Sequence, residues 1–142
     1  MNTETFAKIL SNNDLGNTGS HQAGMLIPKR NTELIAFLPH LDPSVKNPDT
    51  WLNCADQFGY SWKFRYIFYN NKLHDLNGTR NEYRITHMTK FFRQSGAVEG
   101  EEIYLSRDEM GVYSININRS AAQPKRDKNS NKIKLMGWRK IY

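Results

Sequence analysis

The segment Asn77–Thr86 has residue types and a spacing that could read the bases of DNA. Its sequence is Asn-Gly-Thr-Arg-Asn-Glu-Tyr-Arg-Ile-Thr. If Tyr83–Thr86 is a strand, Arg80, Glu82 and Arg84 project from one face at intervals of two. Arg can donate to O6 and N7 of guanine, Glu can accept from N4 of cytosine, and Asn81 can pair with adenine or a phosphate. An exposed Arg–Glu–Arg ladder of little energetic consequence fits these residues equally well.

A second polar segment, Asn13–Gly24, contains three glycines and almost no apolar residues, which predicts a loop. His21 and Gln22 can face a base edge, and Gly19 and Ser20 can offer backbone N–H groups to phosphates. By its composition alone, this segment is more typical of an ordinary surface loop. A phosphate-binding Walker loop is excluded, because no Gly-Lys-Ser/Thr follows the glycines.

Positive charge is concentrated in two blocks of the sequence. The 142 residues carry 20 Lys and Arg against 14 Asp and Glu, a net charge of +6. Residues 60–93 hold seven basic residues against two acids, and residues 119–140 hold eight against one. Residues 99–109 between them hold five acids against one Arg. Such blocks are what a footprint on a nucleic-acid backbone requires, although many basic proteins bind no polyanion.

The common metal-dependent nuclease motifs are absent from the sequence. Pro48-Asp49 could open such a motif, but no Asp or Glu is followed by Lys two residues later. No histidine is followed by Lys at that offset either. We therefore expect no catalytic residue, no metal site and no cofactor in this chain. Mg²⁺ is expected only in a separate catalytic domain, which we expect to follow Tyr142.

The cysteine content and the N-terminus limit the class of protein. The single cysteine, Cys54, excludes an internal disulfide and multi-cysteine zinc modules, and its apolar neighbours indicate a buried structural thiol. No apolar stretch resembles a signal peptide or a membrane span. We expect a cytoplasmic bacterial protein without a membrane partner.

Short apolar runs separated by turn residues indicate a mostly-β domain over residues 1–142. The segment 31–38 predicts a short helix, capped by Asn31 or Thr32, and the segments 70–78 and 123–131 are expected to be loops or turns. Trp62, Phe64, Tyr66 and Phe68 alternate with Lys63, Arg65 and Ile67. Strands are expected at 5–10, 25–27, 51–58, 61–69, 83–86, 103–105, 112–117 and 133–142. The pattern favours a barrel or sandwich of about seven strands with one or two short helices.

Two motifs carry a family resemblance. The segments Asn13–Pro28 and Thr79–Thr86, with the aromatic strand Arg65–Asn70 between them, resemble the N-terminal effector domain of EcoRII-type restriction endonucleases. The resemblance is specific over residues 10–90. It implies a seven-stranded open DNA-binding pseudobarrel, the fold shared with plant B-three-type transcription-factor domains.

The resemblance also implies a mode of DNA binding. Two loops, an N-arm at residues 14–24 and a C-arm at residues 77–86, would grip the major groove of double-stranded DNA, and CC(A/T)GG is the first site to test. The expected contacts are Asn17, Gly19, Ser20, His21 and Gln22 in the N-arm and Thr79, Arg80, Asn81, Glu82, Tyr83 and Arg84 in the C-arm. Lys63, Lys72, Lys90 and the basic residues of 125–140 would neutralise phosphates.

Two other classes of function stay open at this point. One is a catalytic protein with an unrecognised site, against which the lack of clustered acids and histidines counts. The other is a binder of RNA or single-stranded DNA that uses the seven Tyr, seven Phe and three Trp for stacking. Most of these aromatics occur at core spacing in strands, which favours core packing over stacking.

Overall fold

The domain is built mainly of β-strands. The computed structural model describes residues 3–17, 23–119 and 137–142. Within these ranges the elements are β1 (Glu4–Ile9), β2 (Met25–Ile27), α1 (Thr32–Phe37), β3 (Asp49–Asp56), β4 (Ser61–Tyr69), α2 (Asn71–His74), β5 (Glu82–Thr86), α3 (Thr89–Ser95), β6 (Glu102–Arg107), β7 (Tyr113–Asn118) and β8 (Trp138–Ile141). The mostly-β prediction is confirmed, with eight strands and three helices among the described residues.

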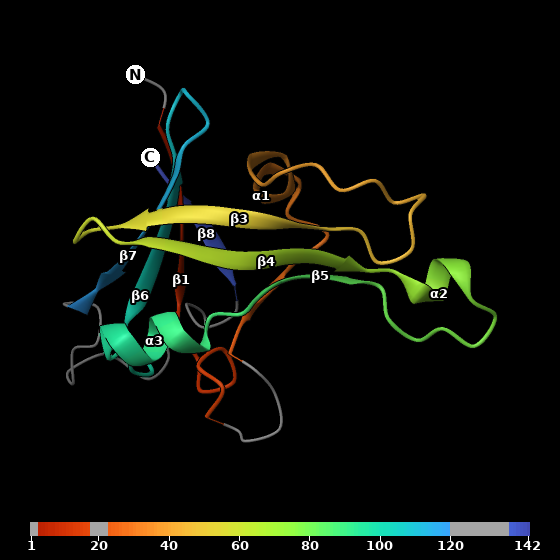
Figure 1. The fold of residues 1–142 in the computed structure, drawn as a ribbon, viewed down its shortest axis with the longest axis horizontal. Coiled ribbons are helices and arrows are strands. Elements are labelled where there is room, and N and C mark those ends of the chain that lie inside the picture. Colours follow the sequence, from red (N-terminus) through yellow and green to blue (C-terminus); the bar gives the residue numbers. More distant parts are fainter. Residues whose placement is uncertain (1–2, 18–22, 120–136) are drawn as a thin grey trace.

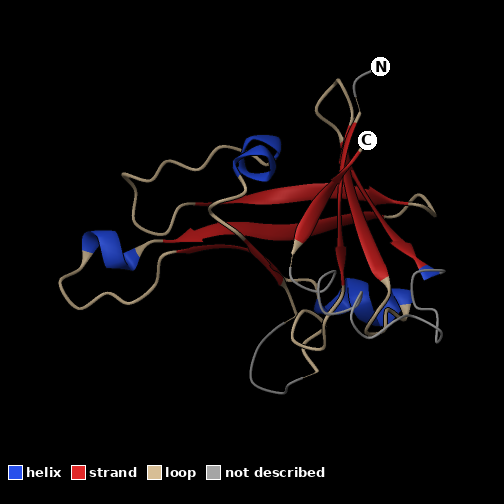
Figure 2. Cartoon of the chain, turned by 180° about the vertical axis from the view of Figure 1, so that it is seen from behind, coloured by secondary structure: helices blue, strands red, loops and turns tan. Residues whose placement is uncertain are grey.

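The strands form one strongly curved sheet in the order β2-β5-β4-β3-β7-β6-β1-β8. Two antiparallel halves meet at a short parallel pairing of β3 with β7, which joins only Cys54–Asp56 to Tyr113–Ile115. Figure 1 and Figure 2 show the two halves turned across one another. The Trp138 indole N–H donates to the Leu26 carbonyl over 3.1 Å and links the two edge strands, β8 and β2. The curved sheet is therefore an open pseudobarrel.

The alternation in β4 places its aromatic side chains in the core as expected. Phe64, Tyr66 and Phe68 are buried, and Trp62 packs against the same cluster. Ile67, which alternates with them, is also buried. Cys54 is buried as predicted, and this burial raises the pKa of its thiol to about 12. The thiol is therefore neutral at physiological pH.

The sequence predicts the helices less well than it predicts the strands. The Asn31 side chain caps α1 by accepting a hydrogen bond from the Leu34 N–H over 3.1 Å, as its position predicts. The expectation of a loop throughout residues 70–78 is wrong, because Asn71–His74 form one helical turn. The sequence does not predict helix α3. This helix ends at Ser95, and its cap residue, Gly96, has a φ of +67°, which suits a residue without a side chain.

The C-terminal expectations are tested only in part. Of the strand predicted at 133–142, Trp138–Ile141 form β8 against β1, and residues 133–136 lie outside the described ranges, as does the predicted turn at 123–131. None of the helices in the ranges 3–17, 23–119 and 137–142 is long and apolar enough to cross a lipid bilayer.

Candidate nucleic-acid interface

The C-arm brings its three charged side chains together, as their spacing predicts. An Arg80 guanidinium nitrogen lies 3.3 Å from Glu82 Oε2, and an Arg84 nitrogen lies 3.2 Å from the same oxygen. The side chains are 42%, 32% and 21% exposed in the order Arg80, Glu82, Arg84. One carboxylate thus holds two guanidinium groups on a surface that solvent still reaches. We call these three residues the charged triad.

Tyr69 fixes the outer member of the charged triad. The Arg80 guanidinium carbon lies 3.6 Å from the centroid of the Tyr69 ring. Tyr69 is in register with Glu82 across the β4–β5 pairing, so the ring and the carboxylate restrain Arg80 together. Sequence reasoning did not single out Tyr69. Its position at the end of β4, on the face opposite Phe68, could have indicated it.

Helix α2 supports the start of the C-arm. The Asn71 side-chain oxygen accepts hydrogen bonds from the backbone N–H groups of Thr79 (3.1 Å) and Arg80 (2.8 Å). The Lys72 N–H donates to the Arg80 carbonyl over 3.0 Å. A Cβ on Gly78 would lie 2.1 Å from the Asn71 carbonyl oxygen, so only glycine permits this approach. The C-arm and α2 are therefore one structural unit.

Tyr83 does not share the exposed face of the charged triad. Its ring stacks on Phe68 with centroids 4.1 Å apart and an angle of 3° between the ring planes. Because side chains alternate along a strand, Tyr83 faces the core when Glu82 and Arg84 face outward. Tyr83 therefore packs on Phe68, and the expectation that it contacts DNA stays a prediction.

Asn81 also differs from the charged triad beside it. Its side-chain oxygen is buried and has no hydrogen-bond partner among the described residues. Thr79 is exposed, and its backbone N–H is used by Asn71. Arg80, Glu82 and Arg84 thus form one polar surface, and the buried side-chain oxygen of Asn81 is not part of it.

The described base of the N-arm is anchored by a buried ion pair. Lys8 from β1 donates to the Asp14 carboxylate, and these side chains are only 10% and 7% exposed. Asp14 also accepts from the Ser11 N–H (3.0 Å), while the Ser11 hydroxyl accepts from the Asp14 N–H (3.1 Å). Asn17 is exposed and donates to the Asn12 side chain over 3.1 Å. The four predicted contacts at positions 19–22 lie outside the described residues: Gly19, Ser20, His21 and Gln22.

The far end of the N-arm is held against β5 and α3. The Ala23 N–H donates to the Thr89 hydroxyl over 3.2 Å, and the Gly24 N–H donates to the Asp14 carbonyl over 2.9 Å. A Cβ on Gly24 would lie 2.5 Å from the Ile85 carbonyl oxygen. Since Ile85 follows Arg84 in β5, the N-arm ends directly beside the strand that carries two members of the charged triad.

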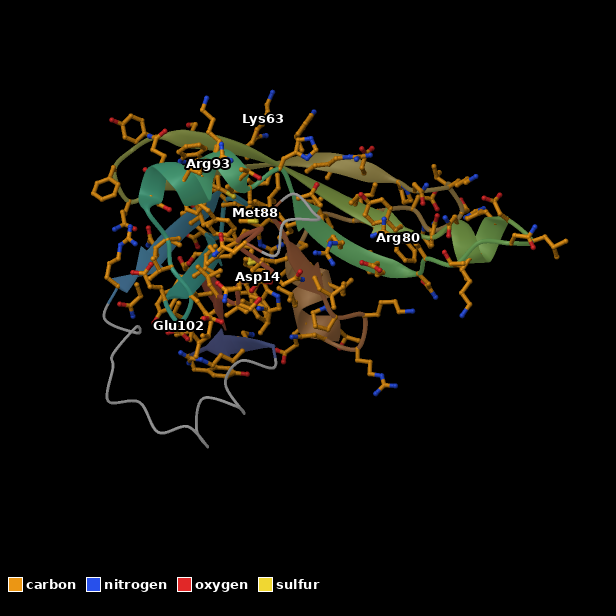
Figure 3. All side chains as sticks on the ribbon, turned by 90° about the horizontal axis from the view of Figure 1, so that it is seen from below. Asp14, Lys63, Arg80, Met88, Arg93 and Glu102 are labelled. Carbon is orange, nitrogen blue, oxygen red and sulfur yellow. The ribbon has the colours of Figure 1, made fainter. Side chains whose placement is uncertain are left out.

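The figures show how the two arms are arranged. In Figure 1 the described base of the N-arm lies below the sheet near α3, while β4, β5 and α2 extend away from the barrel to one side. Figure 3 views the molecule from below, with Asp14 at the N-arm base and Arg80 on the β5 side. The two arms therefore leave the barrel at separate places.

The predicted phosphate contacts lie on different elements. Lys72 is exposed on α2, Lys90 is exposed on α3, and Lys63 is exposed on β4. Lys63 lies 5.7 Å from the centroid of the half-exposed Trp51 ring. Of the described residues, no three or more His, Cys, Asp or Glu side chains form a group that could hold a metal ion.

Comparisons with known sequences agree with the motifs. The family model described as "Restriction endonuclease EcoRII, N-terminal" matches residues 1–99. Auxin response factors 10 and 4 of Arabidopsis thaliana are each 31% identical to this chain over 82% of its length. The chain spans only 15% and 13% of the lengths of these two relatives.

Solved structures show the same fold. The Arabidopsis FUS3–DNA complex is similar with a TM-score of 0.58 and 25% identity, covering 80% of this chain and 94% of that one. The Arabidopsis thaliana LEC2–DNA complex gives a TM-score of 0.59 and 27% identity, over 84% and 96% of the two chains. The UbaLAI restriction endonuclease B3 domain with cognate DNA gives 0.53 and 22%, over 81% and 67%, a likeness of fold alone.

The predicted pseudobarrel is thus confirmed by both the strand arrangement and its structural relatives. The family model covers most of the chain and includes both arms and the charged triad. The chain belongs to the EcoRII N-terminal family of restriction-endonuclease domains and has the B3-type pseudobarrel fold.

Proposed function

We propose that this domain binds double-stranded DNA sequence-specifically, with the N-arm and C-arm entering the major groove. The observation that carries the proposal is the charged triad, in which Glu82 and the Tyr69 ring hold Arg80 while Arg84 lies on the same carboxylate. Arg donates to guanine and Glu accepts from cytosine, so this surface is matched to G·C pairs. The two Arabidopsis structures named above are DNA complexes, which supports the same class of partner.

The domain serves, in this proposal, as the effector or targeting part of a Type II restriction endonuclease. Family membership supports that role, and a catalytic domain C-terminal to this chain would supply cleavage with Mg²⁺. The proposed target is a CC(A/T)GG-type site, whose outer pairs are all G·C. Each good base contact contributes about 1–3 kcal/mol of discrimination, so the charged triad can set the preference for those pairs.

The likeness to auxin response factors supports a second candidate, in which a domain of the same fold targets a protein other than a nuclease. The two candidates share sequence-specific duplex binding and differ in the attached partner. Sequencing the gene beyond the codon for Tyr142 separates them, because only the first predicts an adjoining nuclease domain.

Competition binding tests the shared part of the proposal. A labelled CC(A/T)GG duplex is bound to the domain and competed with unlabelled target, scrambled duplex and single-stranded DNA, with Mg²⁺ present. We expect the target to compete best and the label to stay intact. Equal competition by all three DNAs would contradict sequence-specific duplex binding, and cleavage that depends on an acid of this chain would contradict the non-catalytic role.

A further inference from the structure

A shallow pocket of about 390 Å³ lies between the start of β4 and helix α3. Its lining contains two ammonium groups, an imidazole, an amide and two hydroxyls, and no carboxylate. The lining residues are Tyr60, Ser61, Trp62, Lys63, His87, Lys90 and Gln94. Such a set of donors and positive charges is suited to an anion.

Two carboxylates that contact β4 are engaged in other interactions. Asp56 accepts from the Trp62 indole N–H (2.8 Å) and from two backbone N–H groups of its own turn. Desolvation alone would raise the pKa of the Asp56 carboxyl, but these hydrogen bonds together outweigh it and keep that pKa below its usual value. Asp49 pairs with Arg65 over 2.7 Å. Neither Lys63 nor Lys90 has an ion pair among the described residues. The positive charge of this pocket is therefore not neutralised by the described part of the chain.

The pocket lies on the sheet face that carries the charged triad. Along β4, Lys63, Arg65, Ile67 and Tyr69 alternate with the core-facing aromatics. Arg65 is in register with Thr86, and Ile67 with Arg84. His87 follows Thr86 directly, and its ring meets Trp51 edge-on with centroids 5.7 Å apart. One face of the sheet thus runs from the charged triad to the pocket, with Ile67 buried between them.

The spacing along β4 relates the pocket to the geometry of DNA. Lys63 precedes Ile67 by four residues, which at roughly 3.3 Å per residue is about 13 Å. A duplex rises about 3.4 Å per base pair on each strand, so this span corresponds to about four base pairs. Where β4 runs along the duplex axis and the charged triad reads an outer pair of a five-base-pair site, a phosphate at the pocket lies about four pairs beyond that pair, outside a flank of two pairs.

We propose that Lys63, His87, Lys90 and Gln94 form a subsite for a backbone phosphate of duplex DNA, outside the base pairs that the charged triad reads. This inference rests on the proposed function. Two ammonium groups neutralise the phosphate, while the imidazole and amide supply neutral donors. The subsite lengthens the footprint on the DNA without adding sequence information, because phosphates are alike at every base pair.

Duplex length provides the test. The short duplex holds the target site and about two flanking pairs at each end, and the long duplex extends each flank to about one helical turn, roughly ten pairs. Symmetric flanks are used because a nearly palindromic site can be bound in either orientation. We expect Lys63→Ala with Lys90→Ala to weaken binding to the long duplex about tenfold and to reduce the slope of log affinity against log salt by about 0.9 per phosphate lost. Binding to the short duplex should change less than about twofold, since it lacks the contacted phosphate.

Two controls isolate the subsite. Lys29→Ala removes one exposed positive charge beside α1, in a groove lined by the core-facing Tyr66 and Tyr83, and should leave both duplexes unaffected. Lys63→Arg with Lys90→Arg keeps the charge and should restore long-duplex binding. Melting temperatures should match the wild type, because Lys63 and Lys90 are exposed.

The outcomes separate this inference from the proposed function. Equal losses on the short and long duplexes would place the lysines inside the recognised site and overturn the subsite. An unchanged affinity and salt slope on the long duplex would overturn it as well. Failure of the wild-type domain to prefer its target over scrambled duplex would instead reject the proposed function, and the subsite with it.

Discussion

The side-chain oxygen of Asn71 accepts a hydrogen bond from the backbone N–H of Arg80 over 2.8 Å. This contact connects the only turn of helix α2 to the residue at which the charged triad begins. The Lys72 N–H returns a bond to the Arg80 carbonyl, so both backbone groups of Arg80 are fixed by α2. Helix α2 thus positions Arg80, although none of its residues is buried in the core.

Replacing Asn71 with alanine should weaken specific DNA binding without removing any proposed DNA contact. The variant has no acceptor for two N–H groups, and leaving them unpaired costs about 1–3 kcal/mol of stability in the C-arm where water does not reach them. We expect a lower affinity for the target and an unchanged affinity for scrambled duplex, measured by fluorescence anisotropy. Asn71→Asp retains the acceptor oxygen; its added charge lowers both affinities by repelling phosphates, but their ratio should stay that of the wild type. An Asn71→Ala variant that binds target like the wild type would contradict the positioning role.

Gly24 should not tolerate even a methyl group. Its added Cβ would lie 2.5 Å from the Ile85 carbonyl oxygen, whereas a Cβ on Gly137 would meet nothing within 4 Å. We expect Gly24→Ala to lower the melting temperature by several degrees, an overpacking penalty of about 1–3 kcal/mol, and Gly137→Ala to leave it unchanged. Equal melting temperatures for the two variants would show that Gly24, at the far end of the N-arm, does not pack against Ile85 of β5.

Lys72→Ala should lower the affinity for target and scrambled duplex by the same factor. The ammonium group is exposed on α2 beside the C-arm, where it is expected to contact a phosphate and not a base. Loss of one such contact reduces the salt slope by about 0.9. Both affinities are measured over a series of salt concentrations. A change in the ratio of the two affinities would identify Lys72 as a base reader instead.

The sequence predicts the local elements of the fold well where one pattern dominates. In β4, bulky aromatics at every second position can only face a core, and the structure buries Phe64, Tyr66 and Phe68 there. The period of two also predicts that Arg80 and Arg84 lie on one side of Glu82, and both lie within 3.3 Å of its carboxylate. Such predictions depend only on backbone geometry within a few residues.

Other features depend on contacts that no local pattern reveals. Helix α3 carries adjacent Phe91 and Phe92, both buried, which gives neither a helical nor a strand period. Helix α2 has no buried residue and is stabilised by its hydrogen bonds to the C-arm. The hydrogen bond from Trp138 to the Leu26 carbonyl, which links the two edge strands, joins residues 112 positions apart. The stacking of the Tyr83 ring on Phe68 follows from strand alternation, which sets Tyr83 apart from Glu82 and Arg84.

Glu82 distinguishes a reading surface from a structural ladder of charges. A carboxylate in a DNA interface repels phosphates, so it lowers non-specific affinity and is useful only where it accepts a hydrogen bond from a base. In a structural ladder it would merely hold Arg80 and Arg84, and exposed pairs of that kind contribute at most about 1 kcal/mol. The two roles predict opposite effects of removing it.

The most direct test measures the ratio of scrambled-duplex to target dissociation constants for Glu82→Ala and Arg84→Ala, at one fixed salt concentration and alongside melting temperatures. Glu99→Ala, which removes an exposed acid outside the arms, is the control. For Arg84→Ala we expect the target affinity to fall about ten- to a hundredfold and the scrambled-duplex affinity to change little, because a bidentate base contact contributes roughly 1–3 kcal/mol. For Glu82→Ala we expect the target affinity to fall while the scrambled-duplex affinity holds or rises. A lower melting temperature with an unchanged ratio for Glu82→Ala would contradict base reading by the charged triad.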